Sequence, residues 1–424
     1  MAEHDLTARM VAHMNCHLVF PLLEFLQCRP DRVYAVEILQ AKLRLLIQGT
    51  NMVDYAMDTH KLLHGDVDDD DMVERHHEVV SRLGALAAAA APIISVLKNH
   101  QLGPDKEHNI RMLHERFQIG PDQIEALYQY AKFQFDCGNY PDAAENLHRY
   151  RALCTSSERS LSAQWGKLSA EILNNNWDVA LEELNHLKEM IDSKNSSSPL
   201  NQIQNRIWLM HCSIFIFFNH GNGSYGIIDL FFQDRYLNAI QTDAPHLLRY
   251  LAVAVVVNRR RRNMLKELVK VIQQEQHSYK DPITEFLECL YVNRDFDGAQ
   301  QKLRVILNDP FLGKRIEEGN SITVPLRDEF LENAHLLIFE SYCRIHRCID
   351  IGMLSEKLKM SYNEAELWIM NLVSNSKLDA MIDSASGTLI MTANHANIHE
   401  QFIESLKNLD MRTFMLAKST MEPA

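Results

Sequence analysis

The stretch Gly138–Leu147, GNYPDAAENL, is the most informative part of the chain, because its pattern returns twice further along. It returns as NNWDVALEEL at Asn175–Leu184 and as RDFDGAQQKL at Arg294–Leu303. In each segment Asn or Asp precedes an aromatic residue, Ala follows three residues later, and Leu follows four residues after that. The repeated positions are Tyr140, Ala143, Leu147, Trp177, Ala180, Leu184, Phe296, Ala299 and Leu303. Three matches predict a repeated structural unit.

The residue types in this pattern are typical of two packed helices joined by a tight turn. Asn or Asp suits a helix cap, the aromatic fits between the helices, and the small Ala lets their backbones approach. Apolar residues at helical spacing, such as Leu127 and Ala131, precede the first turn. Tyr140 and Trp177 are 37 residues apart, close to the period of about 34 residues in tetratricopeptide arrays. The sequence therefore predicts a mainly α fold of stacked helix pairs; unrelated hairpins with shared turn chemistry are the alternative.

Composition agrees with a helical fold and excludes several functions. Of 424 residues, 46% are apolar, and there are only 15 Gly and 12 Pro, which is few for a sheet-rich chain of this length. The formal net charge of −13 opposes broad binding to phosphate backbones. The 8 cysteines form no CxxC pair and the N-terminus lacks a secretory signal. We expect reduced thiols and a cytoplasmic protein, with a nuclear pool as an open alternative.

Three features of the first hundred residues carry local predictions. Pro21 indicates the end of one helix and the start of another, because proline breaks a helix interior. The acidic run Val67–Asp71 predicts a solvated loop. The Ala-rich stretch Leu83–Leu97 is too short to cross a bilayer, so we expect no membrane span.

The last hundred residues have a different character, which predicts a winged helix. A long helix, Leu331–Ile345, is followed by Ser361-x-x-Glu364, a capping box that opens a further helix with Ala365, Trp368 and Ile369 buried. Two short apolar runs, LDAMID and TLIMT, then flank the turn SASG and predict a β-hairpin. An amphipathic helix, 398–416, is expected at the end of the chain.

Sequence motifs for catalysis or cofactor binding are weak or missing. One GxGxxG match, Gly221–Gly226, has Asp243 at the distance of a ribose-binding acid, but its flanks read as helices, so we expect an inter-helix loop. The pairs His13/His17 and His60/His64 have no third metal ligand at a fixed spacing. The chain contains no GxxxxGK[ST], HExxH or GxSxG motif. We predict no enzyme activity and no catalytic, cofactor-binding or metal site.

The predicted winged helix is expected to bind protein. Its second helix, Tyr362–Ser376, contains Glu364 and Glu366 and no Lys or Arg, so it would repel a phosphate backbone. One basic cluster lies elsewhere. It is typical of a solvated helix start, and contact with RNA or an acidic partner is the alternative. Its residues are Arg259, Arg260, Arg261 and Arg262.

Helical repeats that lead into a winged helix and a terminal helix resemble the PCI-domain family, shared by the proteasome lid, the signalosome and translation initiation factor three. Long blocks resemble the initiation factor members of that family in particular. They span nearly the whole chain: HLVFPLLEFL (17–26), NMVDYAMD (51–58), YAKFQFDCGNY (130–140), YLNAIQT (236–242), LVKVIQQE (268–275) and YKDPITEFLECLYVN (279–293).

The resemblance implies a non-enzymatic scaffold subunit that supports recruitment of messenger RNA and initiator tRNA to the 40S ribosomal subunit. The implied partners are other subunits of initiation factor three, the 40S subunit and the cap-binding scaffold factor, with a weak RNA contact and no membrane. A lid or signalosome subunit, or a divergent paralogue with a regulatory RNA-binding role, is the alternative. The implied partner-binding residues are Leu378, Met381, Leu389, Ile390, Met391, Phe402, Leu406 and Leu409.

The expected organisation has five parts. They are an N-terminal helical region (1–66), an acidic loop with an Ala-rich helical connector (67–110), helical repeats (111–326), the winged-helix part of the PCI domain (327–394), and a C-terminal helix and tail (395–424).

Overall fold

A computed structural model describes the chain in two compact units. Unit 1 comprises Met1–Glu288 and Lys302–Leu331, and unit 2 comprises Cys289–Gln301 and Glu332–Ala424. The described residues are 4–27, 35–65, 70–100, 103, 105–193, 198–220, 223–258, 263–308, 327–346, 348–358, 361–376, 380–383, 386–391, 406, 409–410 and 412–413.

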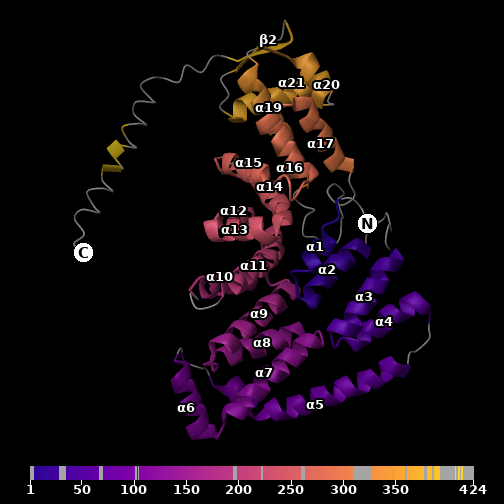
Figure 1. The fold of residues 1–424 in the computed structure, drawn as a ribbon, viewed down its shortest axis with the longest axis vertical. Coiled ribbons are helices and arrows are strands. Elements are labelled where there is room, and N and C mark those ends of the chain that lie inside the picture. The colour runs from indigo at the N-terminus through magenta and orange to yellow at the C-terminus, as the bar shows by residue number, and fades with distance from the viewer. Residues whose placement is uncertain are drawn as a thin grey trace. The chain divides into compact units, whose positions relative to one another are not determined.

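Unit 1 consists of helices that follow one another along the chain (Figure 1). Consecutive helices from α7 to α11 pack against each other. The helices are α1 (Thr7–Val11), α2 (Cys16–Gln27), α3 (Ala35–Gly49), α4 (Val53–His64), α5 (Asp70–Asn99), α6 (Lys106–Phe117), α7 (Pro121–Asp136), α8 (Tyr140–Arg151), α9 (Ser157–Leu173), α10 (Trp177–Ser193), α11 (Pro199–Asn219), α12 (Gly223–Phe231), α13 (Asp234–Asp243), α14 (Leu248–Val257), α15 (Met264–Glu275) and α16 (Pro282–Glu288).

The three repeat segments adopt one geometry, which confirms the predicted helix pairs. Each aromatic is the first residue of a helix: Tyr140 begins α8, Trp177 begins α10, and Phe296 begins α17 (Phe296–Asn308). The three alanines have no exposed surface, and the three leucines are also buried. An Ala at this depth allows close helix packing, because a larger side chain would push the neighbouring backbone away.

A left-handed residue stands two positions before each aromatic. The φ angles are 88° at Gly138, 59° at Asn175 and 53° at Arg294. In the first two turns the next residue donates its backbone N–H five residues back, from Asn139 to Gln134 and from Asn176 to Glu171. These are the bonds of a Schellman helix end, which needs a left-handed residue. In the third turn a π-helical segment, Cys289–Asn293, adds one residue.

Helix α5 corrects the expected acidic loop and is longer than the Ala-rich stretch alone. It begins at Asp70, so the end of the acidic run lies in a helix rather than a loop, where carboxylates favour the N-terminus. It also runs unbroken through Leu83–Leu97 and is the one helix among the described residues that is long and apolar enough to cross a membrane. One face of α5 packs in the core of unit 1 through Ile93 and Leu97, beside Leu113.

Pro21 does not separate two helices; it lies inside α2. A proline inside a helix costs about 3 kcal/mol through one lost hydrogen bond and a steric clash. Here Leu18, Val19, Phe20 and Leu23 are all buried around it. Their packing offsets that cost, which the local pattern could not reveal.

The N-terminal segment (residues 4–20) packs against helices far along the chain, within unit 1. Arg249 is buried and donates to both oxygens of Asp281, over 2.8 and 3.1 Å, and to the backbone oxygen of His4 over 3.0 Å. The Tyr250 hydroxyl lies 3.1 Å from Met10 Sδ. A buried ion pair stabilises only when its geometry is good and its remaining bonds are satisfied. The hydrogen bond from Arg249 to the His4 backbone oxygen therefore ties the N-terminal segment to the Arg249–Asp281 ion pair.

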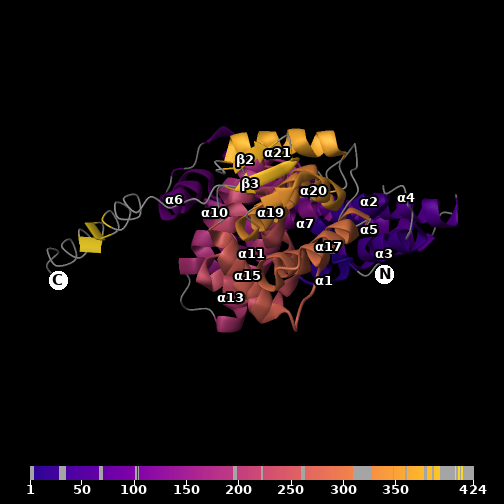
Figure 2. The same cartoon turned by 90° about the horizontal axis from the view of Figure 1, so that it is seen from above.

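Unit 2 has the order of a winged helix. After the start of α17 come α19 (Arg327–Ile345), β1 (Cys348–Asp350), α20 (Ile351–Leu358), α21 (Tyr362–Ser376), β2 (Ala380–Asp383) and β3 (Thr388–Met391). The predicted hairpin is confirmed as β2 and β3, which lie beside α20 and α21 (Figure 2). Strand β1 was not predicted; it pairs with β3 and makes an antiparallel sheet of order β1-β3-β2.

The capping box of α21 is formed as predicted. Glu364 N–H donates to Ser361 Oγ over 3.3 Å, and Ser361 N–H donates to Glu364 Oε2 over 3.1 Å. The Ser361 backbone N–H and, secondly, the Ser361 side chain bond to the Glu364 carboxylate and hold its pKa below the usual range. The helix then buries Ala365 and Ile369. The core of unit 2 is Leu336, Phe339, Tyr342, Cys343, Ile349, Ile351, Ile369 and Leu389.

Candidate assembly surface

The sheet of unit 2 carries a row of exposed side chains across all three strands. Ile390 on β3 is opposite Cys348 on β1 and opposite Met381 on β2. Met381 is 66% exposed and Ile390 is 42% exposed, and Cys348 is exposed as well. Side chains directly opposite each other on one face of a sheet are close neighbours. The three residues therefore form one small apolar patch, which we call the outer sheet patch.

The neighbouring row of the sheet faces inwards, which corrects one predicted partner residue. Leu389 pairs with Ile349 and Ile382, and both Leu389 and Ile349 are fully buried in the core of unit 2. Successive residues of a strand point to opposite faces, so Leu389 and Ile390 cannot share a surface. Leu389 is therefore removed from the partner surface. Met391 packs partly against the same core, and Leu378 lies outside the described residues.

Helix α21 adds exposed apolar side chains to unit 2. Leu367 and Met370 are three residues apart and exposed, and so is Tyr362 at the start of the helix. A Cβ atom added to Gly387 would lie 3.0 Å from the Tyr362 hydroxyl, so this helix begins against the β2–β3 turn. Exposed large apolar residues grouped in one small unit indicate a protein-binding surface.

The predicted terminal helix is described only in part. Leu406 and Leu409 are exposed, and Thr413 Oγ1 donates to the backbone oxygen of Leu409 over 2.8 Å, as in a helical turn. Phe402 lies outside the described residues.

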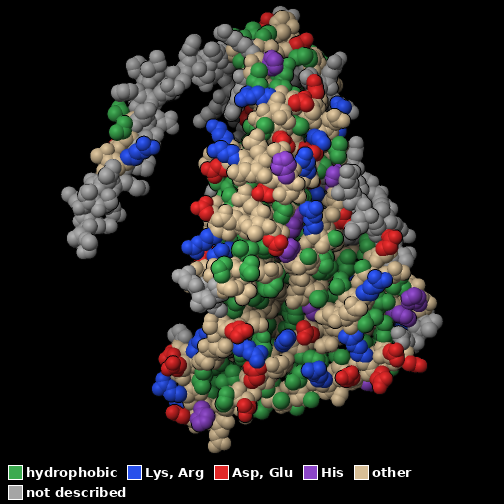
Figure 3. Space-filling view, viewed as in Figure 1, with side chains coloured by type: hydrophobic (Ala, Val, Ile, Leu, Met, Phe, Trp, Pro, Cys, Tyr) green, Lys and Arg blue, Asp and Glu red, His purple; other side chains and the backbone are tan. Residues whose placement is uncertain are grey.

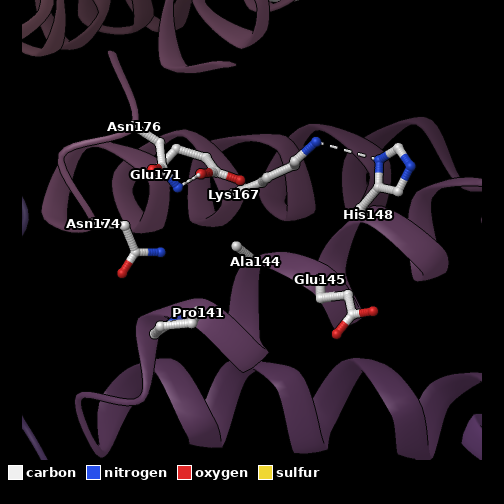
Figure 4. A pocket seen from close by; sticks show the side chains of 8 residues that line it. All are labelled: Pro141, Ala144, Glu145, His148, Lys167, Glu171, Asn174 and Asn176. Atoms are coloured by element: carbon white, nitrogen blue, oxygen red, sulfur yellow. Dashed lines mark hydrogen bonds between the residues drawn. The ribbon is translucent and has the colours of Figure 1, made fainter. Parts of the chain in front are cut away.

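A polar pocket lies between the first two repeat turns in unit 1, with a volume of about 540 Å³ (Figure 4). Its lining comes from α8 and α9 and the loop after α9: Pro141, Ala144, Glu145, His148, Lys167, Glu171, Asn174 and Asn176. Lys167 Nζ donates to His148 Nδ1 over 3.2 Å, and Asn176 donates to Glu171 over 2.8 Å. Four of the polar groups at its wall are thus bound to each other in pairs.

Behind this pocket, the buried Glu183 on α10 binds groups from α8 and α9. It forms ion pairs with Lys167 and Arg151 and accepts a hydrogen bond from Gln164. Burial alone would raise the pKa of Glu183, but the Lys167 hydrogen bond and the two positive charges outweigh it and hold that pKa below its usual range. Burial and the charges of Lys167 and Arg151 lower the pKa of His148. A neutral His148 accepts a hydrogen bond from Lys167, which is itself paired with Glu183. His148 therefore links α8 to α9 and does not activate a nucleophile.

The remaining motifs have structural explanations. Gly223 and Gly226 lie in helix α12 after a helix, without the strand that dinucleotide binding needs. A Cβ on Gly223 would lie 1.7 Å from the Phe217 backbone oxygen, and one on Gly226 would lie 2.3 Å from the Phe217 ring. These glycines therefore allow α11 and α12 to pack closely. Within the described ranges, no group of three or more His, Cys, Asp or Glu could hold a metal ion.

Surface charge agrees with protein binding. Lys and Arg side chains are interspersed with Asp and Glu on the face in view (Figure 3). A mixed surface of this kind does not make the single-sign field that attracts nucleic acid broadly. The cluster Arg259–Arg262 lies outside the described residues.

Comparison with protein families gives the class of the protein. Residues 300–393 match the PCI domain, and residues 5–134 match the eIF3 subunit 6 N terminal domain. Together with the repeats, the winged helix and its exposed patch, these matches define a PCI-domain subunit of a multi-protein complex.

Relatives identify the member of that class. The chain is 62% identical to the E subunit of eukaryotic translation initiation factor 3 from Arabidopsis thaliana, over 99% of this chain and 97% of the relative. It is 44% identical to the protein of the same name from Drosophila virilis, over 98% and 95%. The chain therefore belongs to the E-subunit family of eukaryotic translation initiation factor 3. Members carry the name of initiation factor subunits, a non-catalytic role, and the lid and signalosome alternatives are not favoured.

Proposed function

We propose that the chain is a structural subunit of translation initiation factor 3 that acts through protein contacts and performs no catalysis. Through these contacts it helps the factor bring messenger RNA and initiator tRNA to the 40S subunit, and it works in the cytoplasm. Its near full-length identity to the E-subunit relatives carries this proposal. The self-satisfied polar network around Glu183 supports a structural role for the repeat region.

The sister subunits are proposed to dock on unit 2. In the sheet formed by the described residues, strand β2 has a strand neighbour on one side only, so its other side could accept a further strand. The outer sheet patch and the α21 side chains Leu367 and Met370 lie in the same small unit. Burial of an exposed apolar surface would contribute about 25 cal/mol per Å² removed from water.

The partners beyond the factor itself are the 40S subunit and the cap-binding scaffold factor. We assign α5 to unit 1 and not to a bilayer, since Ile93 and Leu97 belong to a core cluster.

A nuclear pool and a weak RNA contact at Arg259–Arg262 remain predictions, as do the boundaries of the five parts. Replacing the four arginines with alanine should lower crosslinking to RNA and leave assembly intact.

The test of the proposed function uses the tagged chain expressed in its own cells at normal level. Purification followed by mass spectrometry should recover the other subunits of initiation factor 3, and the chain should sediment with 40S subunits in a sucrose gradient. Recovery of lid or signalosome subunits instead, or sedimentation of the chain as a free monomer, would contradict the proposal.

A further inference from the structure

The carboxyl-terminal end of helix α9 lies at the polar pocket of Figure 4, within unit 1. Glu171 is in the last turn of this helix, Asn174 is its C-cap, and Asn176 follows in the loop. The carbonyl end of a helix carries a partial negative charge, which a nearby cation offsets. The last turn of α9 contains no basic residue, whereas the last turn of α8 contains three. The end of α9 therefore has no cation of its own.

Glu171 is a buried carboxylate without a cation partner. It is 8% exposed, and it forms no ion pair within the part of the chain that the structure describes. Asn176 donates to Glu171 Oε2 over 2.8 Å, and Oε1 has no hydrogen bond to any described residue. Oε1 is not one of the fully enclosed polar atoms, so it is open to the pocket. Because burial penalises a charge, a buried glutamate is rarely left without a partner.

Lys167, one turn earlier on α9, is not the missing cation. Its ammonium group forms an ion pair with Glu183 and donates to His148 Nδ1 over 3.2 Å. Figure 4 shows this ammonium group turned towards His148. Glu145, the other carboxylate at the wall, already has an arginine partner on its own helix. Among the described residues, Glu171 is thus the carboxylate of this pocket that still lacks a cation.

The groups beside Glu171 select a guanidinium as the cation. The Asn174 side chain and Asn176 Oδ1 form no hydrogen bond within the described ranges, and Figure 4 shows both at the Glu171 end of the pocket. A guanidinium has five N–H donors in one plane and can bond to several oxygens at once, whereas an ammonium has three donors. Pro141 and Ala144 supply an apolar part of the wall, which suits the methylene stem of an arginine.

We propose that this pocket binds an arginine side chain from a linear segment of another subunit. The guanidinium pairs with Glu171 Oε1 and donates to the amide oxygens of Asn174 and Asn176, and its stem lies against Pro141 and Ala144. The identity of the partner as a subunit of the initiation factor rests on the proposed function, whereas the cation site at the end of α9 does not. The pocket belongs to unit 1, so this contact is additional to the outer sheet patch of unit 2.

The first test identifies the occupant in the intact factor. Photoreactive benzoylphenylalanine replaces Glu145, which lines the pocket, and in a control it replaces Glu115 on α6, which does not. After irradiation, position 145 should crosslink to one arginine-containing segment of another subunit, and position 115 should not. A segment without arginine, no crosslink, or crosslinks only within this chain, in an otherwise complete factor, would overturn the proposal. Recovery of no factor at all would overturn the proposed function, and the identity of the partner with it.

The second test asks whether Glu171 and the arginine act as a pair, with the crosslinked segment made as a synthetic peptide. In the full chain, Glu171→Gln keeps the acceptor for Asn176 and removes the charge, and should weaken binding about tenfold. Citrulline in place of the arginine keeps the shape without the charge and should weaken binding by a similar factor. The two changes together should weaken binding little more than either alone, because each removes the same interaction.

Two further variants complete the second test. Glu115→Gln should bind the peptide normally, and Asn174→Ala, at a half-buried side chain without hydrogen bonds, should weaken binding several-fold. Thermal unfolding of each variant checks that the fold is kept. Unchanged binding by Glu171→Gln and Asn174→Ala, or losses from Glu171→Gln and citrulline that multiply when combined, would contradict the site.

Discussion

Units 1 and 2 differ in how completely they cover their apolar side chains. In unit 1 the exposed large apolar residues of the described ranges are scattered from α3 to α17: Ile47, Leu62, Val80, Val179, Leu200, Trp208 and Val305. Unit 2 is much shorter and exposes Ile345, Met353, Tyr362, Leu367, Met370, Met381, Ile390, Leu406 and Leu409. A small unit has less interior in which to place such residues, and grouped exposure indicates contact with other chains. We therefore propose that the repeats build a framework and that the winged helix offers the surface that binds other subunits.

The largest expected effect on stability comes from placing a charge on the buried face of strand β3 and not on its exposed face. Leu389→Asp places a carboxylate in the core of unit 2 and should cost about 4 kcal/mol or more, enough to unfold that unit. Ile390→Asp, one residue away on the exposed face, should cost less than about 1 kcal/mol. Limited proteolysis and thermal unfolding of both variants measure this. Equal loss of stability in the two variants would show that the inward and outward rows are wrongly assigned.

Acid should weaken unit 1 through buried histidines. Burial lowers the pKa of His17 to about 4, of His211 to about 4 and of His246 to about 3. An unfolded histidine binds a proton below about pH 6.5, whereas these folded ones stay neutral, so stability is full above pH 6.5 and falls as the pH drops towards 4. Between pH 7 and pH 5, each of these three histidines should lower the free energy of unfolding by about 2 kcal/mol.

Denaturant titrations at several pH values measure this loss. The variant His17→Phe keeps the ring against Phe135 and should lose less stability on acidification than the unmodified chain does. Identical pH slopes for the two proteins would mean that His17 is not buried in its neutral form.

The turn geometry of unit 1 can be tested with glycines. Gly138→Ala should destabilise by about 1–2 kcal/mol, because φ is 88° there and the new Cβ would lie 3.0 Å from Met52 Cε. Gly84→Ala, in the middle of α5 with nothing within 4 Å, should stabilise by about 0.5–1 kcal/mol. Chemical denaturation of both variants checks the opposite signs. The same sign in both would argue against the left-handed turn.

The smallest expected effect is an increase in stability. Arg294 has a φ of 53°, a conformation that costs a long side chain about 1 kcal/mol, so Arg294→Gly should stabilise slightly. Asn175→Gly, at a φ of 59°, should gain less, because Asn tolerates this conformation better than Arg does. Thermal melts of the two variants give the order. A lower melting temperature in both variants would mean that the Arg294 and Asn175 side chains stabilise the fold by more than their left-handed backbone conformation costs.

Much of the fold was predictable because each repeat is specified locally. Tyr140, Trp177 and Phe296 start their helices as the pattern indicates, and the Ser361–Glu364 box caps α21. The left-handed position was visible only at Gly138; Asn175 and Arg294 give weak or no signal for it. The turn pattern is recognisable because capping and close packing involve residues within one or two helical turns.

What the sequence could not predict depends on distant contacts. Strand β1 is three residues long and exists because Ile349 pairs with Leu389, about forty positions later. Pro21 is tolerated inside α2 by packing that no local rule describes. The assembly surface was predicted as a stretch of chain, so Leu389 was included, and only the register separates it from Ile390.

Assembly through the outer sheet patch is tested most directly by the size of the complex that the chain enters. Met381→Asp with Ile390→Asp should leave the isolated chain folded and remove it from initiation factor 3, as measured by native mass spectrometry of tagged protein from cells. The control Leu200→Asp, at a residue of unit 1 that is 78% exposed, should assemble normally. A double variant that is folded and still present in the complex at full occupancy would contradict the account.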